Sequence, residues 1–151
     1  MTSIDPPLVD LIDRFLTMPY CFTLQCCYGH FLHAGQRDWK NLKRLPISDT
    51  IGTVEYRIAY LALCIQHNNA GISLLKELSG IPAIDPGYIQ FGCAEWFWEQ
   101  QVNSYALQVE PERYRTKDRI SVDYQEALHL QRTRDECFAE LKRIIANRLR
   151  E

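Results

Sequence analysis

The run VEYRIAYLALCIQ (residues 54–66) decides the fold that this chain can adopt. After Arg57, apolar side chains occupy odd and even positions alike. A strand with one solvated face alternates between polar and apolar residues, so this run is typical of a central strand that is covered on both faces. Its apolar part is about half as long as a helix that crosses a bilayer. We therefore expect a buried central strand and no transmembrane span.

The chain before this strand predicts a helix and a second strand. Asp5 precedes two prolines in an N-cap pattern, and apolar residues then recur at helical spacing until shortly before Pro19. Residues 20–31 are rich in aromatic, Thr and Cys side chains, which favours a strand. Residues 34–52 show no sustained period, and a loop of that length inside a compact domain is often functional.

The chain after the central strand predicts a helix and a hairpin. Residues 67–69 offer capping groups for a helix with an apolar stripe. Two strand-like runs follow, residues 87–98 and 104–111, and a short polar segment joins them. Their proximity in sequence favours antiparallel pairing.

One long helix is expected at the C-terminal end of the chain. It begins at Asp123, which stands in capping-box register with Glu126. Arg134 interrupts its apolar stripe. We expect this arginine to extend along the edge of the core, and pairing inside a polar pocket is the alternative.

This order of elements predicts one α+β domain over residues 1–151. Four strands, with a hairpin between the last two, favour a mainly antiparallel four-stranded sheet. Helices with one apolar stripe each are expected on one face of that sheet, the long C-terminal helix among them. No repeat or domain linker is visible, and a chain of this length buries enough surface to fold without disulfides.

The composition is that of a globular protein in a reducing compartment. Hydrophobic residues make up 46% of the chain and charged residues 24%, as in folded proteins. The N-terminal segment has acidic residues among its apolar ones and no positive region, so we expect a cytoplasmic protein without a secretory signal. The six cysteines form no CxxC pair and are expected to be reduced. Because the net charge is only −2, an anionic partner must be held by a local patch.

The segment LQCCYGHFLH (residues 24–33) raises the question of a metal site. Its two cysteines and two histidines are ligands that zinc accepts. Neighbouring residues of a strand point to opposite faces, so Cys26 and Cys27 bind one ion only if the chain kinks between them. Cys27, His30 and His33 could still gather around a turn. The spacing nevertheless argues against zinc, and we expect no metal.

Two other interpretations of this segment remain. In the first, the chain turns at Gly29, so that His30 folds back on Cys27 and activates the thiol as a nucleophile. In the second, Gly29 is a bulge or strand end, and His30 is a surface residue of a turn.

The loop that follows gives the best indication of a partner. Four cations and one indole lie between Arg37 and Arg44, and such a group can bind phosphates and stack a base. We expect Arg37, Trp39 and Lys40 to hold phosphate and base, and a solvated charged loop is the alternative. A second basic segment, residues 113–119, would complete a basic rim if the sheet brings both segments to one edge.

The aromatic run EWFWE (residues 95–99) offers a different kind of surface. At alternating spacing, Trp96 and Trp98 share one face of their strand. We expect that face to be core. If it is uncovered, the tryptophans form a platform for a planar ligand or a contact between subunits, because large exposed apolar patches are rare on monomers.

One motif resembles a known family. The lead-in PYCFTLQ and the motif CCYGH (residues 26–30) resemble the tRNA wybutosine-synthesis methyltransferases, in which a Ser-Cys-Ser-Gly-Arg type motif follows a YYTT-like lead-in at the end of an early strand. The later order of strand, helix, hairpin and long helix is also similar. The resemblance implies S-adenosylmethionine as cofactor and tRNA as substrate. It also implies a polar corner at Cys27 and His30 that faces the basic loop around Trp39.

Two functional hypotheses follow. The first is a small cytosolic protein that acts on nucleotides or RNA, with RNA modification as its enzymatic form. Gly29 then permits a close turn, Cys27 and His30 are the catalytic pair, and the basic loop binds the ligand. The second is a non-catalytic binding or assembly module, a homodimer formed through the aromatic strand around Trp96 and the terminal helix. The usual phosphate-loop, zinc-protease and hydrolase motifs are absent from the sequence.

Overall fold

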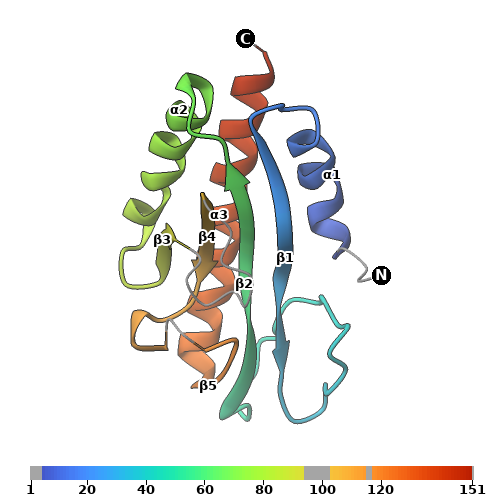
Figure 1. Ribbon diagram of the computed structural model, residues 1–151. Coiled ribbons are helices and arrows are strands. Elements are labelled where there is room, and N and C mark those ends of the chain that lie inside the picture. Colours follow the sequence, from blue (N-terminus) through green and yellow to red (C-terminus); the bar gives the residue numbers. More distant parts are fainter. Residues whose placement is uncertain (1–4, 94–102, 115–116, 151) are drawn as a thin grey trace.

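The computed structural model describes residues 5–93, 103–114 and 117–150. Figure 1 shows the arrangement of the elements. In chain order they are α1 (Pro6–Phe15), β1 (Cys21–Leu32), β2 (Thr53–Ile65), α2 (Asn69–Ser79), η1 (Ile81–Ile84), β3 (Ile89–Cys93), β4 (Ser104–Val109), η2 (Glu112–Tyr114), β5 (Arg119–Asp123) and α3 (Tyr124–Leu149). The predicted α+β class is confirmed.

The strands form one antiparallel sheet with β2 at its centre. The order is β1-β2-β4-β3, and β5 pairs with the first part of β2. On one side β2 pairs with β1, and on the other it pairs first with β5 and then with β4. Every residue of β2 from Ile58 to Ile65 is buried. The prediction of a central strand covered on both faces is confirmed.

The fifth strand, β5, is the element that the sequence did not reveal. Its five residues alternate between exposed and buried, and only Ile120 and Val122 face the core. Two apolar residues among charged ones do not distinguish a strand from a polar loop. The segment becomes a strand because the edge of β2 offers it backbone hydrogen-bond partners.

The helices pack against this sheet and close the core. In Figure 1, α3 runs behind the sheet, with α1 beside β1 and α2 on the side of β3. The predicted caps are present: the side chain of Asn68 accepts a hydrogen bond from the Gly71 N–H, and that of Asp123 accepts one from the Glu126 N–H. The apolar stripe of α3 is buried along most of the helix. None of the described helices is long and apolar enough to cross a membrane.

Candidate functional site

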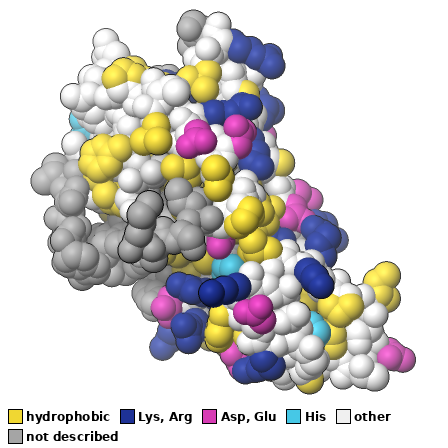
Figure 2. All heavy atoms as spheres, turned by 90° about the vertical axis from the view of Figure 1, so that its right-hand side faces the viewer, with side chains coloured by type: hydrophobic (Ala, Val, Ile, Leu, Met, Phe, Trp, Pro, Cys, Tyr) yellow, Lys and Arg dark blue, Asp and Glu magenta, His cyan; other side chains and the backbone are white. Residues whose placement is uncertain are grey.

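A cavity of about 680 Å³ lies beside β1, between the start of α1 and the loop that follows β1. Four predicted site residues contribute to its wall: Cys27, His30, Trp39 and Lys40. Asp5, Arg57 and Tyr60 also line it, and the sequence analysis did not assign them to a site. Figure 2 views the molecule from this side, where Lys and Arg side chains are spread over the surface and some of them border a histidine. The structure therefore brings the cysteine, the histidine and the basic loop to one place.

Gly29 makes this arrangement possible because it reverses the alternation of side chains in β1. Donor atoms of Cys27 and His30 lie within 4.8 Å of each other, although residues three apart point to opposite faces of a regular strand. On the other face, the rings of Tyr28 and Phe31 are also three residues apart and contact the same guanidinium group. Gly29 has a φ of +89°, a backbone conformation that residues other than glycine rarely adopt. One glycine thus places both functional side chains on the cavity side.

The strand does not turn or end at Gly29, contrary to both sequence interpretations. Pairing with β2 continues through it, with Tyr28 opposite Ala59 and His30 opposite Arg57. Bonding to the neighbouring strand holds the chain extended, so the positive φ changes side-chain direction without reversing the chain. A bulge is present in β1, but it lies near Leu24, where the register shifts.

Asp5 is the residue that ties α1 to this corner. It stands at the N-cap position, as predicted, but its side chain caps no helical N–H. The two prolines that follow have no N–H to offer, and the N–H of Leu8 bonds the backbone carbonyl of Asp5. The carboxylate is therefore free to accept hydrogen bonds from the Tyr28 N–H at 2.9 Å and from Nε2 of His30 at 3.1 Å.

His30 is a buried, charged member of the cluster. It is only 5% exposed, so the interpretation as a surface residue of a turn is wrong. Nε2 faces Asp5, and Nδ1 lies 3.3 Å from the carbonyl oxygen of Asn41. Hydrogen bonds with Asp5 and with Cys27 raise the pKa of His30 to about 10, against the effect of burial. At neutral pH the ring is an imidazolium that can stabilise an anion but cannot accept a proton.

The carboxylate completes the ion pair. Burial alone would raise the pKa of Asp5, but hydrogen bonds from His30 and from the Tyr28 N–H outweigh burial and lower it. The positive charge of Arg57 lowers it further. Asp5 is therefore ionised at neutral pH.

Arg134 supports the corner from the opposite face of β1. Its guanidinium is 4.2 Å from the centre of the Tyr28 ring, and Nη1 donates to the carbonyl of Tyr28 at 3.0 Å and to that of Gly29 at 3.4 Å. Nε donates to Asp135 at 2.9 Å. The side chain is 3% exposed, so the expected position at the core edge is wrong and the polar pairing is correct. Without the long cationic side chain of Arg134, the carbonyls of Tyr28 and Gly29 would lose this hydrogen-bond donor. Buried backbone carbonyls without partners cost free energy.

The basic loop is brought to the cavity only in part. Trp39 and Lys40 line the cavity, whereas Arg37 lies outside the lining and pairs with Glu55 at 2.9 Å. The second basic segment does reach the first, because the guanidinium of Arg119 stacks on the Trp39 ring, 4.6 Å from its centre. The two basic segments therefore meet at Trp39 and Arg119, but Arg113 pairs with Glu126 instead, and Arg37 does not belong to the cavity.

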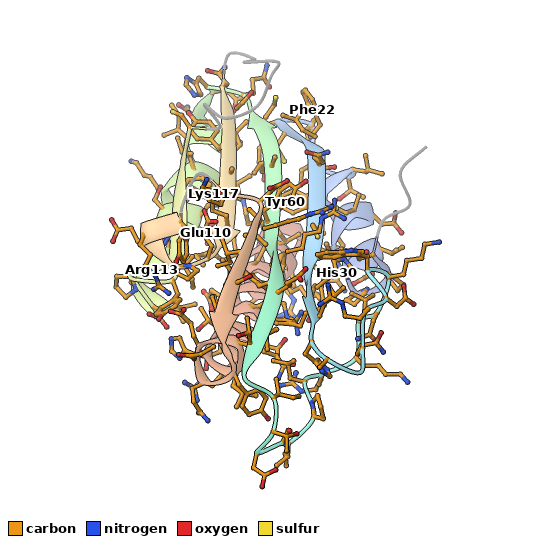
Figure 3. The ribbon with its side chains drawn as sticks, turned by 90° about the horizontal axis from the view of Figure 1, so that it is seen from below. Phe22, His30, Tyr60, Glu110, Arg113 and Lys117 are labelled. Carbon is orange, nitrogen blue, oxygen red and sulfur yellow. The ribbon has the colours of Figure 1, made fainter. Side chains whose placement is uncertain are left out.

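Two cavity residues come from β2, and one of them has a signal in the sequence. Arg57 is a cation inside an otherwise apolar run, which is unusual for a central strand. Tyr60 is paired with Cys27 across the two strands, a neighbour that only the register reveals. In Figure 3, Tyr60 and His30 mark this part of the sheet, and Glu110 lies on the other side of β2.

The remaining candidates do not join the cluster. Cys26 borders the cavity but is not among the converging donors, and burial, with Asp5 and Cys27 nearby, raises its pKa to about 11. Nδ1 of His33 lies 2.8 Å from the carbonyl oxygen of Ala34. Trp96 and Trp98 lie outside the described residues.

The alternative assembly hypothesis depended partly on the terminal helix. The apolar residues of α3 are used within the chain, against the sheet and α1. That stripe is therefore not a free surface for a second copy.

Comparisons with known proteins leave the function to be argued from the site. No family model matches the chain, and no curated protein matches it. Among solved structures, the crystal structure of a hypothetical protein from Aeropyrum pernix is similar, with 12% sequence identity and a TM-score of 0.48. The match covers 94% of this chain and 98% of that chain. A similarity at this level carries no functional argument, and the resemblance to the wybutosine family stays a prediction.

Proposed function

We propose that this protein binds a nucleotide in the cavity beside β1, either free or as one unit of a single-stranded RNA, and acts on it at the corner formed by Asp5, Cys27 and His30. The observation that carries the proposal is that one cavity is lined by cationic groups, aromatic rings and this corner together. In this proposal the cations and the rings bind the nucleotide, and the corner acts on it.

The charge of the cavity wall favours an anionic ligand. Lys40 and Arg57 are both exposed cations on the wall, and His30 is a third positive charge. Asp5 is the negative charge of the cluster, and His30 already pairs with it. Within the described residues neither Lys40 nor Arg57 forms an ion pair, so both are available for phosphate oxygens.

The aromatic side chains provide a surface for a base. Trp39 and Tyr60 both line the cavity, and stacking of a base on an aromatic ring contributes about 1–3 kcal/mol. Arg119 occupies one face of the Trp39 ring, so a base must stack on the other. The size also fits, because about 680 Å³ falls within the range of about 300–1,000 Å³ that is common for small-ligand pockets.

Calorimetric titration at low salt tests this proposal. The ligands are the four nucleoside 5′-monophosphates and a short single-stranded RNA, and S-adenosylmethionine forms a separate arm because the family resemblance implies it. Binding should weaken as salt rises, and Lys40→Ala combined with Arg57→Ala should weaken it and reduce its salt dependence by about one phosphate contact per cation removed.

The same loop offers a matched control. Arg37→Ala combined with Lys43→Ala removes two positive charges from residues outside the cavity lining, so it should leave binding almost unchanged. Absence of binding by the unmodified protein at low salt, or equal losses in the two double variants, would refute the proposal. A preference for RNA over mononucleotides identifies the polymer as the ligand.

A further inference from the structure

The corner brings together three different metal-binding donors. One carboxylate oxygen of Asp5, the sulfur of Cys27 and one ring nitrogen of His30 all lie within 4.8 Å of one another. Asp5 directly precedes α1, and Cys27 and His30 belong to the second half of β1. Cys27 and His30 are buried, and all three residues border the cavity.

We propose that Asp5, Cys27 and His30 bind one Zn²⁺ ion, with a fourth coordination position open to the cavity. Three protein ligands and one open position are the arrangement of catalytic zinc sites, whereas structural sites use four protein ligands. This goes beyond the proposed nucleotide binding, and it does not depend on the cations Lys40 and Arg57 or on the rings of Trp39 and Tyr60, which are different residues.

The spacing of the donors is close to what zinc requires. Nε2 of His30 and Oδ2 of Asp5 are 3.1 Å apart, and the corresponding edge of a zinc tetrahedron is about 3.3 Å. No two of the three donor atoms are more than 4.8 Å apart. A sulfur-to-oxygen edge of a zinc tetrahedron is about 3.6 Å, so zinc binding requires the donors to approach one another by up to about an ångström.

The hydrogen bonds around the donors are also those of a metal site. A zinc-binding histidine usually directs its other ring nitrogen at a carbonyl or carboxylate, which fixes the ring. Nδ1 of His30 has such a partner in the carbonyl oxygen of Asn41. The ligating carboxylate is usually held as well, and the Tyr28 N–H holds Asp5.

The donor set selects the metal. A thiolate beside an imidazole suits zinc, whereas Mg²⁺ and Ca²⁺ require oxygen ligands throughout. The sequence argument against zinc concerned Cys26 and Cys27 on one ion, and the structure removes that difficulty. Cys26 is not part of the cluster, and Asp5 supplies the ligand that the sequence segment lacked.

Titration of the full chain with Zn²⁺, after removal of metal with a chelator, tests the proposal. In competition with a chromophoric chelator, one Zn²⁺ should bind per chain. Cys27→Ser should weaken binding by at least about 100-fold, because loss of a ligand costs more than the 10- to 100-fold loss caused by removal of an outer partner. Cys26→Ser, the same change one residue away, should bind Zn²⁺ as the unmodified chain does.

Cobalt provides a spectroscopic readout of the thiolate ligand itself. Co²⁺ bound in the same site should show a thiolate-to-cobalt charge-transfer band, and Cys27→Ser should abolish it. A chain that binds no Zn²⁺, that shows no such band with Co²⁺, or that binds Zn²⁺ equally well after Cys27→Ser would overturn the proposal.

The metal and the nucleotide can be separated by experiment. Lys40→Ala combined with Arg57→Ala should lose nucleotide affinity and still bind one Zn²⁺. If the nucleotide panel fails while Zn²⁺ binds at Cys27, the proposed function falls and the metal site stands. If Zn²⁺ fails while nucleotides bind, the reverse holds, and Cys27 remains a candidate nucleophile.

Discussion

Asp5 and His30, 25 residues apart in sequence, meet through a 3.1 Å contact between Oδ2 and Nε2. The contact joins a residue that precedes a helix to one near the end of an edge strand. Because the same carboxylate oxygen also accepts the Tyr28 N–H, the start of α1 is fastened to β1 at the point where the side-chain alternation reverses. Four predictions test the packing around this point and elsewhere in the fold.

Gly29 and Gly35 are the glycines with a positive φ, and we expect Gly29→Ala to destabilise the protein more than Gly35→Ala. A Cβ at Gly29 would lie 3.0 Å from the Cβ of Ala59 and 3.3 Å from Cε1 of Tyr56, in addition to the strain of φ +89°. We expect a loss of about 1–3 kcal/mol in the free energy of unfolding, measured with urea. Gly35→Ala is the control, because its φ is +96° and a Cβ there meets nothing within 4 Å. Equal losses at both positions would show that contact with β2 does not matter.

Arg134→Met should destabilise the protein because it removes the donor to the carbonyls of Tyr28 and Gly29. A buried acceptor that loses its hydrogen-bond donor costs about 1–3 kcal/mol, and the carbonyls of Tyr28 and Gly29 both lose one here. Arg44→Met removes an exposed partner of the same Asp135, so it should cost no more than about 1 kcal/mol. Chemical denaturation of the two variants measures the difference, and similar losses would contradict the supporting role of Arg134.

Glu110→Gln should change how stability depends on pH. Glu110 is 0% exposed, and burial raises its pKa to about 8, against the hydrogen bond from Gln108. The folded state therefore keeps a proton that the unfolded state releases near pH 4.5. Stability from this group is complete below the unfolded pKa and is lost as pH rises through the folded pKa. Between these values, the free energy of unfolding of the unmodified protein should fall relative to the variant by up to about 1.4 kcal/mol per pH unit.

Urea titrations across this pH window measure the effect. The exposed Glu112→Gln variant is the control for loss of one negative charge near the same place, and it should follow the unmodified protein. A constant difference between Glu110→Gln and the unmodified protein at all pH values would show that Glu110 is not buried as a neutral acid.

The cysteines should differ strongly in their reaction with iodoacetamide under native conditions. Cys93 is exposed, whereas Cys137 is 0% exposed and burial raises its pKa to about 12. Only the thiolate is alkylated, so Cys93 should react first and Cys137 only after unfolding. Mass spectrometry of peptides after timed quenching gives the order, and early labelling of Cys137 would show that the core opens near α3.

The sequence by itself determined the central strand and the helices. A strand with apolar residues at both odd and even positions has to be buried on both faces, and β2 is buried in that way from Ile58 onward. The caps at Asn68 and Asp123 were predictable because each side chain accepts a hydrogen bond from the N–H of the residue three positions later. Interactions over such short separations depend on local sequence alone.

Only the tertiary structure decided which residues form the candidate site. The sequence indicated Cys27, His30, Trp39 and Lys40, but it could not supply Asp5, whose helix has to pack beside β1 before the carboxylate meets the histidine. The sequence also could not show that Lys40 lines the cavity whereas Arg37 lies outside it and pairs with Glu55. The physical reason is that local hydrogen bonds and periodicity follow from neighbouring residues. The encounter of distant side chains depends instead on strand register and on the direction that one glycine gives to the side chains of its strand.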